Sequence, residues 1–425
     1  MNRIIYPKIK NYITKKDISL AKKIDKKGGE LYIVGGYVRD MLIDKSPRDK
    51  DYLVTGLSKE EFKDLFEDAK LVGESFPVFL LEGKEFAFPR IDNSLKKDLK
   101  SRDLTINSIA IDILNKHIVY EGIALEDLKE GILRDNILEG NSSLKLDPLR
   151  VYRVARFASE LDFSVFYETA ISMSSLSNRL NNIAPERIFE EFRKVLVSDR
   201  PDKFFSILKY INCLNIHFEE IDDFWNKSQP DKYHPEGDVG EHFLQTLKLL
   251  PEYNGSEAFR FAVAMHDIGK GLTPKEELPH HYKHDRIGYK ALNGLAASIP
   301  LPTKWFNAAK LAIEEHQRIK KWREMKPGKV VRLFKRIKRS PLLIDDMVDL
   351  VEIDYRARGK DEPLNKVDTN MEGIIDLYYS MFDNTGGEDI DSTRYSGKEF
   401  GEQLFQHRCH WLNKKRSEIL EGLDE

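Results

Sequence analysis

The chain has 425 residues, of which 41% are hydrophobic and 33% charged, and its 25 glycines and 17 prolines are too few for a fibrous or low-complexity protein. The 68 basic and 71 acidic residues leave a net charge of −3, so the overall charge indicates no partner, and two cysteines exclude a disulfide scaffold. The sequence contains neither the roughly 18 consecutive apolar residues of a membrane span nor the apolar run of a signal peptide, so we expect a multi-domain cytoplasmic protein with no membrane partner.

The first part of the chain alternates between helix and strand signals. Residues 17–30 predict a short helix closed by a glycine pair, and residues 31–34 predict an apolar strand. Two glycines follow, and a helix begins near Tyr37. A second strand is expected at 51–56 and a capped helix after Ser58, with further strand-like runs out to residue 112. This order predicts a mixed α/β domain.

From Asp147 onward, apolar residues recur at spacings of three and four, and strand signals nearly vanish. The rest of the chain is therefore expected to be helical. We predict an N-terminal extension, an α/β head, a helical neck and body, a helical domain rich in histidine and a helical tail (residues 1–30, 31–135, 136–225, 226–345 and 346–425).

A glycine pair, Gly35-Gly36, lies between the first predicted strand and the next helix. Such a turn lets the backbone approach a phosphate group and points the free N–H groups of the helix at it. Arg39, one helical turn further on, adds a cation. We expect Gly36 and Arg39 to bind a nucleotide. The alternative is that the glycines are there for close packing alone.

Two carboxylates, Asp49 and Asp51, flank Lys50 at the start of the second predicted strand. Side chains alternate along a strand, so both carboxylates are expected on one face. Two carboxylates at this spacing can hold Mg²⁺, which binds the phosphates of a nucleotide. The alternative is a polar strand start that faces water. The glycine turn on the neighbouring strand favours a catalytic role.

Several blocks of the sequence resemble those of one enzyme family. The segment LYIVGGYVRDML, followed by RDKDYLV, is similar to the head of the class II tRNA nucleotidyltransferases, the CCA-adding enzymes. Later family blocks follow in order as GESFPVFL, SRDLTINSIA, LDPLRVYRVARF and PERIFEEF. The likeness continues through HPEGDVGEH, HDIGKGLTP and HHYKHDRIG, which resemble the HD domain of the long bacterial members.

The resemblance implies a multi-domain α+β fold, in which a polymerase-β-like nucleotidyltransferase head is followed by an all-α neck and body and a helical HD domain. It implies template-independent addition of CCA to the 3′ end of tRNA from CTP and ATP, with release of pyrophosphate. Asp49 and Asp51 are then the catalytic residues, with Mg²⁺ as cofactor, in a monomer or a homodimer. Two alternatives stay open: a partial enzyme that adds only CC or only A, and a poly(A) polymerase.

The segment DPLRVYRVARF places Asp147, Arg150, Arg153 and Arg156 three residues apart, which predicts one polar stripe along a helix. A carboxylate accepts hydrogen bonds and a guanidinium donates them, so an Asp–Arg pair matches C and A but leaves groups unpaired against U or G. The resemblance assigns this selection to Asp147 and Arg150. It also implies nucleotide contacts for Arg153, Arg156 and Arg102. Without it, an amphipathic helix with a solvated arginine face is the simpler interpretation.

Histidines are concentrated in one part of the chain, with seven of the eleven at positions 234, 242, 266, 280, 281, 284 and 316. His266 and Asp267 end an apolar segment, where an ionised carboxylate is costly unless it is paired or bound to metal. His242, upstream, and Asp354, downstream, would complete a set of four metal ligands. Imidazole with carboxylate suits Mn²⁺, Ni²⁺, Fe²⁺ or Mg²⁺.

The resemblance of this region to HD domains implies a phosphatase or 2′,3′-cyclic phosphodiesterase activity. The alternative is an inactive helical scaffold. The remaining histidines of the cluster are candidates for outer-shell or substrate groups, and the sequence does not separate these roles. Further on, residues 318–339 carry eleven Lys or Arg residues and one Glu, a net charge of +10. This stretch predicts either contact with RNA phosphates or a solvated helix face.

Four features depart from the family pattern. Leu146 stands where an acidic residue is usual, and Ser101 replaces an arginine. The segment VYEGIALEDL lacks the usual Asp-Pro, and the stretch between Arg90 and Leu99 is short. In the family, that stretch is associated with the change from C to A addition, so partial addition stays an alternative.

Overall fold

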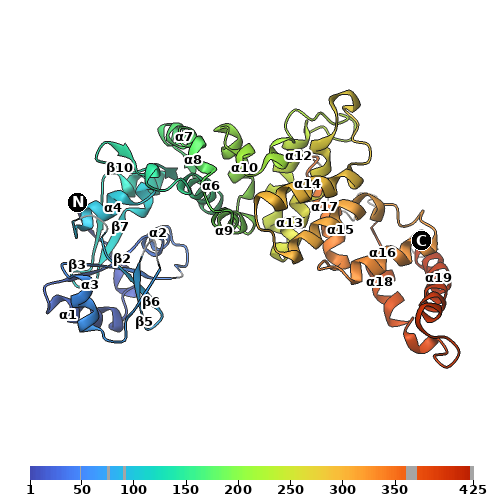
Figure 1. Ribbon diagram of the computed structural model, residues 1–425, viewed down its shortest axis with the longest axis horizontal. Coiled ribbons are helices and arrows are strands. Elements are labelled where there is room, and N and C mark those ends of the chain that lie inside the picture. The colour runs from blue at the N-terminus through green and yellow to red at the C-terminus, as the bar shows by residue number, and fades with distance from the viewer. Residues whose placement is uncertain (48, 74–76, 90–91, 360–370, 422–425) are drawn as a thin grey trace. The chain divides into compact units, whose positions relative to one another are not determined.

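The computed structural model describes residues 1–421 apart from 48, 74–76, 90–91 and 360–370 (Figure 1). Part of the GESFPVFL block, the arginine that precedes Asp49, and the start of the short stretch before Leu99 therefore lie outside the described residues. The chain divides into two compact units, Met1–Ile183 and Ala184–Glu425. No helix of the described part is both long enough and apolar enough to span a membrane.

The first unit is built on an eight-stranded sheet in the order β1-β8-β7-β2-β3-β6-β5-β4. Only the β3–β6 pair is parallel among these strands. The strands are β1 (Asn2–Ile5), β2 (Glu30–Val34), β3 (Asp51–Thr55), β4 (Lys70–Val72), β5 (Val78–Leu81), β6 (Lys84–Ala87), β7 (Ile109–Asp112) and β8 (His117–Tyr120). Two short pairs add β9 (Ile132–Leu133), β10 (Ile137–Leu138), β11 (Asn141–Ser142) and β12 (Ser164–Val165).

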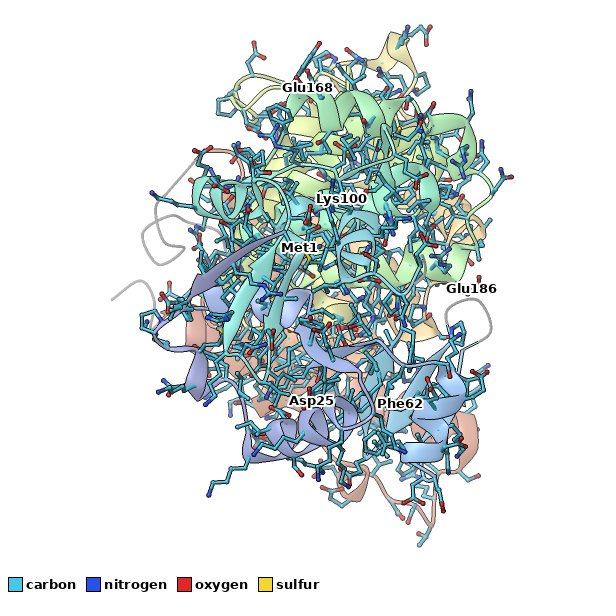
Figure 2. All side chains as sticks on the ribbon, turned by 90° about the vertical axis from the view of Figure 1, so that its left-hand side faces the viewer. Met1, Asp25, Phe62, Lys100, Glu168 and Glu186 are labelled. Atoms are coloured by element: carbon cyan, nitrogen blue, oxygen red, sulfur yellow. The ribbon has the colours of Figure 1, made fainter. Side chains whose placement is uncertain are left out.

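Eight helices accompany these strands in the described part of the first unit: α1 (Lys15–Asp25), α2 (Gly36–Leu42), α3 (Lys59–Leu65), α4 (Leu95–Ser101), α5 (Ala124–Glu130), α6 (Arg150–Leu161), α7 (Tyr167–Ser174) and α8 (Ser177–Leu180). The predicted capping box before α3 is present, because Ser58 and Glu61 each bond the backbone of the other. Phe62 of α3, labelled in Figure 2, is fully buried. Its ring packs on those of Phe79 and Phe86.

The second unit consists of packed helices, as the spacing of apolar residues predicted. They are α9 (Pro185–Leu196), α10 (Pro201–Tyr210), α11 (Glu219–Asp222), α12 (Val239–Leu249), α13 (Glu257–Met265), α14 (His284–Ser298), α15 (Thr303–Ile319), α16 (Pro327–Lys338), α17 (Ile344–Arg356), α18 (Ile374–Asp383) and α19 (Gly397–Glu421). Helices α13 and α17 contact each other and both contact α12 and α15, and the four helices surround the histidine cluster.

The N-terminal residues contribute to the sheet and to its packing. β1 pairs with β8 at one edge of the sheet. Helix α1 carries Asp17, which is fully buried and closes a capping box with Thr14. The Asp17 carboxylate also accepts hydrogen bonds from Lys50 (2.6 Å) and Tyr52 (2.7 Å) of the β3 region and from Lys84 (3.2 Å) of β6. One buried carboxylate therefore ties α1 to two adjacent strands.

We predict that Asp17→Asn destabilises the first unit by about 2–4 kcal/mol at pH 7, because two lysines lose their buried counter-charge. Burial alone would raise the pKa of Asp17, but its hydrogen bonds, first that from Lys50, hold it well below its usual range. This stabilisation is therefore present above the unfolded pKa of about 4 and declines below it. Hydrogen–deuterium exchange of β3 and β6 amides measures the change.

A matched control is Lys16→Ala, which removes the ion pair between Lys16 and Glu82, two side chains that are both about half exposed. An exposed pair of this kind contributes less than about 1 kcal/mol. Equal exchange rates in wild type and Asp17→Asn at pH 7 would contradict the role given to Asp17.

Candidate functional site

The glycine turn adopts a backbone conformation that requires glycine. Gly35 has φ of +74°, and a Cβ atom built on it would lie 2.9 Å from Nη1 of Arg102. Helix α2 begins at the next residue, Gly36, and a Cβ atom there would lie 3.5 Å from Nη2 of Arg39. Two of the arginines predicted to contact a nucleotide therefore lie directly against the turn.

Asp51 opens β3 beside this turn, paired with Val34 of β2 and with Glu85 of β6. Lys50 and Tyr52 both reach Asp17, so by alternation along the strand Asp51 faces the other way. Partial desolvation raises the pKa of Asp51, and the carboxylates of Glu85 and Asp49 raise it further against the opposing charge of Arg102. Three carboxylates thus repel one another at this position.

The three carboxylates fit a divalent cation, because oxygen donors are the ligands that Mg²⁺ prefers and a cation would relieve their repulsion. Asp49, Asp51 and Glu85 are all exposed, so such a site would be open to substrate. Glu85 was not predicted. It stands next to Asp51 only through the register of β6 against β3, which the sequence does not reveal.

The predicted arginines Arg39, Arg153 and Arg156 lie around the ring of Phe157 in α6, with guanidinium carbons 4.9, 5.4 and 4.0 Å from its centroid. Arg39 also donates to Oδ1 of Asn107 (2.9 Å). Arg39 and Arg156 are buried. Side chains from the glycine turn and from the LDPLRVYRVARF block are therefore brought together.

Asp103 links α6 to the segment that contacts Arg39. It accepts hydrogen bonds from Arg153 (2.8 Å) and Asn107 (2.9 Å). Burial would raise the pKa of Asp103, but Arg153, Asn107 and Arg150 together hold it well below its usual range. Arg102 of this block was predicted from the sequence but Asp103 was not, because its partner Arg153 lies 50 positions away in the chain.

The predicted polar stripe is wrong at its first residue. Helix α6 begins at Arg150, and Asp147 lies before it in extended conformation, at the end of the 3₁₀ turn Ser143–Leu146. The cause is local, since the Asp147 carboxylate accepts the N–H of Leu149 (3.1 Å) and Pro148 is unfavourable inside a helix. The alternative of a solvated arginine face is also wrong for Arg150, which is buried.

Arg150 is fixed at the start of α6 by two backbone carbonyls. Its Nη1 donates to the carbonyl oxygens of Ser101 (2.7 Å) and Ser143 (2.9 Å). The serine that departs from the family pattern thus contacts this arginine through its backbone carbonyl. The N–H of Arg150 donates to the carbonyl oxygen of Asp147 (3.0 Å), so Asp147 lies next to Arg150 at the start of α6.

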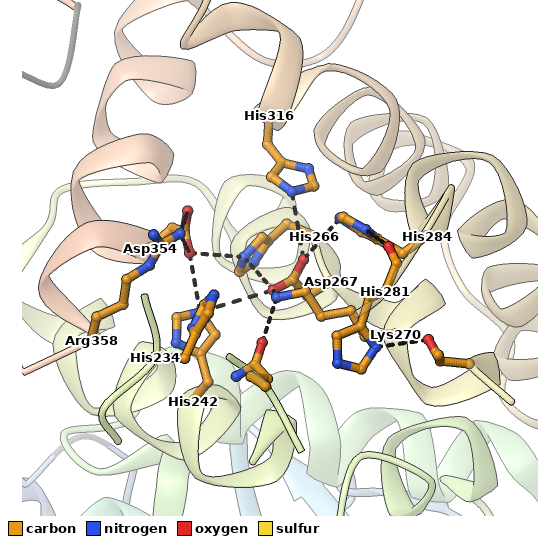
Figure 3. Close-up of polar contacts among 12 residues, drawn as sticks. His234, His242, His266, Asp267, Lys270, His281, His284, His316, Asp354 and Arg358 are labelled. Atoms are coloured by element: carbon orange, nitrogen blue, oxygen red, sulfur yellow. Dashed lines mark hydrogen bonds and ion pairs between the residues drawn. The ribbon is translucent and has the colours of Figure 1, made fainter. Parts of the chain in front are cut away.

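In the second unit, the four predicted metal ligands converge (Figure 3). Nε2 of His242, from α12, lies 3.1 Å from Oδ1 of Asp354, from α17. Nε2 of His266, which follows α13, lies 3.4 Å from Oδ2 of Asp267. All four side chains are buried, and one donor atom from each lies within 4.8 Å of the others.

The orientation of the rings suits metal binding. Nδ1 of His242 donates to Oε1 of Glu236 (2.8 Å), and Nδ1 of His266 donates to the carbonyl oxygen of Val263 (2.7 Å). In the neutral form of each ring, Nε2 then carries a lone pair, and a metal ion would take the place of a proton there. Among the described residues, both Nε2 atoms are buried without a hydrogen bond. A divalent metal ion fits this donor set, because imidazole nitrogen and carboxylate oxygen are both offered.

Basic side chains surround the two carboxylates. Lys270 pairs with Oδ2 of Asp267 (2.6 Å) and Arg358 with Oδ2 of Asp354 (2.8 Å). These cations help to keep the pKa of both carboxyl groups well below the usual range, despite burial. Burial would also lower the pKa of His266, but Asp267 and Asp354 raise it to about 9. Sequence interpretation missed Lys270, although it stands in the same HDIGK motif.

Some cations of the basic stretch 318–339 form ion pairs within the second unit. Arg318 and Arg336 both pair with Glu315, which is fully buried, and Lys320 pairs with Asp354. Burial raises the pKa of Glu315 to about 7. These three cations have structural partners, and contact of the stretch with RNA stays a prediction.

Three family models match the chain. They are the "Poly A polymerase head domain" over residues 31–79, the "Probable RNA and SrmB- binding site of polymerase A" over 162–224 and the "HD domain" over 239–346. The second extends from the first compact unit into the second, and the third covers His242, His266 and Asp267.

Similar proteins and structures match over most of the chain. The multifunctional CCA protein of Shewanella frigidimarina is 33% identical over 92% of this chain and 99% of its own length. That of Mannheimia succiniciproducens is 36% identical over 77% and 84%. Among solved structures, a Thermotoga maritima CCA-adding enzyme complexed with tRNA aligns over 100% of both chains with 21% identity and a TM-score of 0.66. The Bacillus stearothermophilus CCA-adding enzyme in complex with CTP aligns over 99% and 98%, with 19% identity and a TM-score of 0.65. The predicted multi-domain α+β fold is confirmed.

Proposed function

The chain belongs to the family of the multifunctional CCA proteins, and we propose that it adds CCA to the 3′ end of tRNA from CTP and ATP, with release of pyrophosphate. The observation that carries the proposal is the meeting of Asp49, Asp51 and Glu85 beside the glycine turn. Carboxylates next to a phosphate-binding turn are what nucleotidyl transfer requires.

We assign Asp49 and Asp51 as the catalytic carboxylates that hold Mg²⁺, with Glu85 beside them. The cation bound there would lower the pKa of the 3′-hydroxyl and neutralise charge on the phosphates. The backbone at Gly36 and the guanidinium groups of Arg39 and Arg102 orient the triphosphate. The hydroxyl oxygen forms a bond to the α-phosphorus, and the bond from that phosphorus to the departing pyrophosphate breaks.

Selection of C and A is assigned to Asp147 and Arg150, with Arg153 and Arg156 contributing to the nucleotide site. The fixed position of Arg150 supports this assignment. Its guanidinium donates to the carbonyl oxygens of Ser101 and Ser143, so it cannot move to match the different hydrogen-bonding groups of U or G. A wrong base would leave buried donors or acceptors unpaired, which is worth up to about 10⁴-fold in discrimination.

For the second unit we propose hydrolysis of phosphate monoesters or 2′,3′-cyclic phosphates. His242, His266, Asp267 and Asp354 would hold a divalent metal ion such as Ni²⁺, Mn²⁺ or Mg²⁺, which supplies Lewis acidity toward a phosphate. Lys270 lies beside these residues and donates to Gln229 (2.7 Å), so it is held where it can contact a phosphate oxygen.

Two alternatives to full CCA addition remain. Partial addition follows from the departures at Leu146, at Ser101 and in the short stretch before Leu99. A poly(A) polymerase is the second, because two of the matching family models carry that name.

Sequencing of reaction products tests the proposal. The full chain is incubated with tRNA that ends at the discriminator base, with CTP and ATP given singly and together. The expected product ends in CCA when both nucleotides are present and in CC with CTP alone. Products that stop at CC with both nucleotides, or that carry a run of A, would replace the proposal with one of its alternatives.

Substitution of the carboxylates tests the assigned residues. Asp49→Asn and Asp51→Asn should each lower kcat for nucleotide addition at least about 100-fold, because each removes a charged cation ligand. Glu85→Gln should lower it less, by about 10-fold. The matched control is Glu82→Gln in the same hairpin, which pairs only with Lys16 among the described ion pairs and should keep full activity. Unchanged kcat in Asp51→Asn would overturn the assignment.

A further inference from the structure

Arg102, one of the arginines assigned to the triphosphate, is held by a carboxylate of the helix that precedes it. Its Nε and Nη2 both donate to Oδ2 of Asp98, at 3.3 and 3.1 Å. Asp98 lies four residues earlier, in α4, and is 7% exposed. Among the ion pairs of the described residues, Arg102 pairs with Asp98 alone. A buried carboxylate therefore fixes one side of this guanidinium.

Helix α4 brings this ion pair to the face of the sheet on which Asp51 lies. Leu95 and Leu99 of α4 belong to one buried cluster with Leu53 of β3. Leu53 lies two positions after Asp51, so the two side chains leave β3 on the same side. The end of α4 therefore lies on the side of the sheet to which the Asp51 carboxylate points.

The other side of the Arg102 guanidinium, which carries Nη1, is directed at the glycine turn. A Cβ atom on Gly35 would lie 2.9 Å from Nη1 of Arg102 and 4.0 Å from Oδ2 of Asp51. Burial raises the pKa of Asp51, and the charge of Arg102 acts in the opposite direction. The guanidinium and the carboxylate are therefore neighbours across the turn, although no ion pair joins them among the described residues.

The backbone of Arg102 is fixed as well. Nδ2 of Asn136, a buried residue, donates to the carbonyl oxygen of Arg102 (2.9 Å). The N–H of Arg102 donates to the carbonyl oxygen of Leu99 (3.3 Å). A change at Asp98 is therefore expected to redirect the guanidinium and to leave the backbone in place.

Two carboxylates lie within reach of this guanidinium, Asp98 on one side and Asp51 on the other. Asp51 repels Asp49 and Glu85, so a cation that approached these three would be stabilised. An arginine pairs strongly with a carboxylate, because it offers two parallel N–H donors. Such a pair with Asp51 would occupy the oxygen atoms that a Mg²⁺ ion needs. The bonds to Asp98 hold the guanidinium short of that position.

We propose that Asp98 is a positioning residue of the head, which holds Arg102 at the triphosphate and thereby leaves Asp51 available for Mg²⁺. The inference rests on the proposed nucleotidyl transfer, in which Asp51 is a cation ligand and Arg102 orients the triphosphate. Nη1 keeps its two N–H donors for phosphate oxygens while Nε and Nη2 stay on Asp98. Arg102 thus contacts the anion without displacing the cation, and Asp98 itself contacts neither.

Asp98→Asn tests the proposal, because asparagine keeps the size of the side chain and removes its charge. In crystals of the full chain without nucleotide, Arg102 of this variant should lie about 2.8 Å from a carboxylate oxygen of Asp51. Titration of Mn²⁺ by calorimetry should show binding weakened by about 10-fold in the class of sites that Asp51→Asn abolishes. The Mg²⁺ concentration that gives half-maximal addition of C to tRNA should rise by the same factor.

A second substitution separates positioning from stability. Arg102→Ala alone should raise KM for CTP about 10-fold, while its Mn²⁺ binding in the head is no weaker than in the wild type. In the double variant, Asp98→Asn with Arg102→Ala, no guanidinium remains to occupy Asp51. The Mn²⁺ affinity lost in Asp98→Asn should therefore return, whereas a purely structural effect of Asp98 would persist.

The matched control is Asp92→Asn, which removes the exposed ion pair with Lys97 of the same helix and should change neither Mn²⁺ affinity nor KM. Wild-type Mn²⁺ affinity in Asp98→Asn, or a loss that persists in the double variant, would overturn the positioning role and leave the proposed nucleotidyl transfer standing. Absence of any class of sites that Asp51→Asn abolishes would overturn the cation site and the inference together. Circular dichroism confirms that each variant is folded.

Discussion

The buried carboxylate of Asp17 binds Lys50 and Tyr52 of the β3 region and Lys84 of β6, and this contact decides how both strands face. Because side chains alternate, Asp51 and Glu85 are directed to the opposite side of the sheet. Lys50 and Lys84 pair with Asp17 on the first side, so these lysines do not neutralise the carboxylates on the other side, and the repulsion there favours a bound cation. The catalytic role proposed for the head therefore depends on a residue of the N-terminal helix that contacts no nucleotide in this account.

The two sites differ in how the repulsion among their carboxylates is reduced. In the head, Asp49, Asp51 and Glu85 are exposed, so their repulsion is partly screened by water and a Mg²⁺ ion can bind with its substrate. In the second unit, Asp267 and Asp354 are buried among imidazoles, lysine and arginine. Nitrogen donors and a dry environment favour a tightly bound transition metal ion. In the proposed function, the head therefore carries a metal ion that exchanges with substrate, and the second unit carries one that stays bound.

Local signals in the sequence predicted the elements well. The capping box at Ser58 and Glu61, the strand after the glycine turn and the helical second half are all present. The set His242, His266, Asp267 and Asp354 also converges as expected. The spacing of residues wrongly predicted Asp147 within the helix of Arg150. Its carboxylate accepts the N–H of Leu149, and the helix begins only at Arg150.

Contacts that depend on tertiary packing could not be predicted from the sequence. Glu85 reaches Asp51 only through strand register, and Asp103 meets Arg153 only after the helix docks. The histidines after position 279 could not be sorted, because glycine-mediated helix packing brings His284 and His316 to Asp267 while His281 is directed elsewhere.

In the proposed function, the carboxylates of Asp49 and Asp51 hold a divalent cation on the face of β3 opposite to Asp17. Anomalous diffraction from crystals grown with Mn²⁺ and a non-hydrolysable CTP analogue tests it directly. We expect an anomalous peak in contact with both carboxylates and with the triphosphate. Manganese bound only in the second unit, with these two carboxylates pointing away from the nucleotide, would show that they are not the cation ligands of the head.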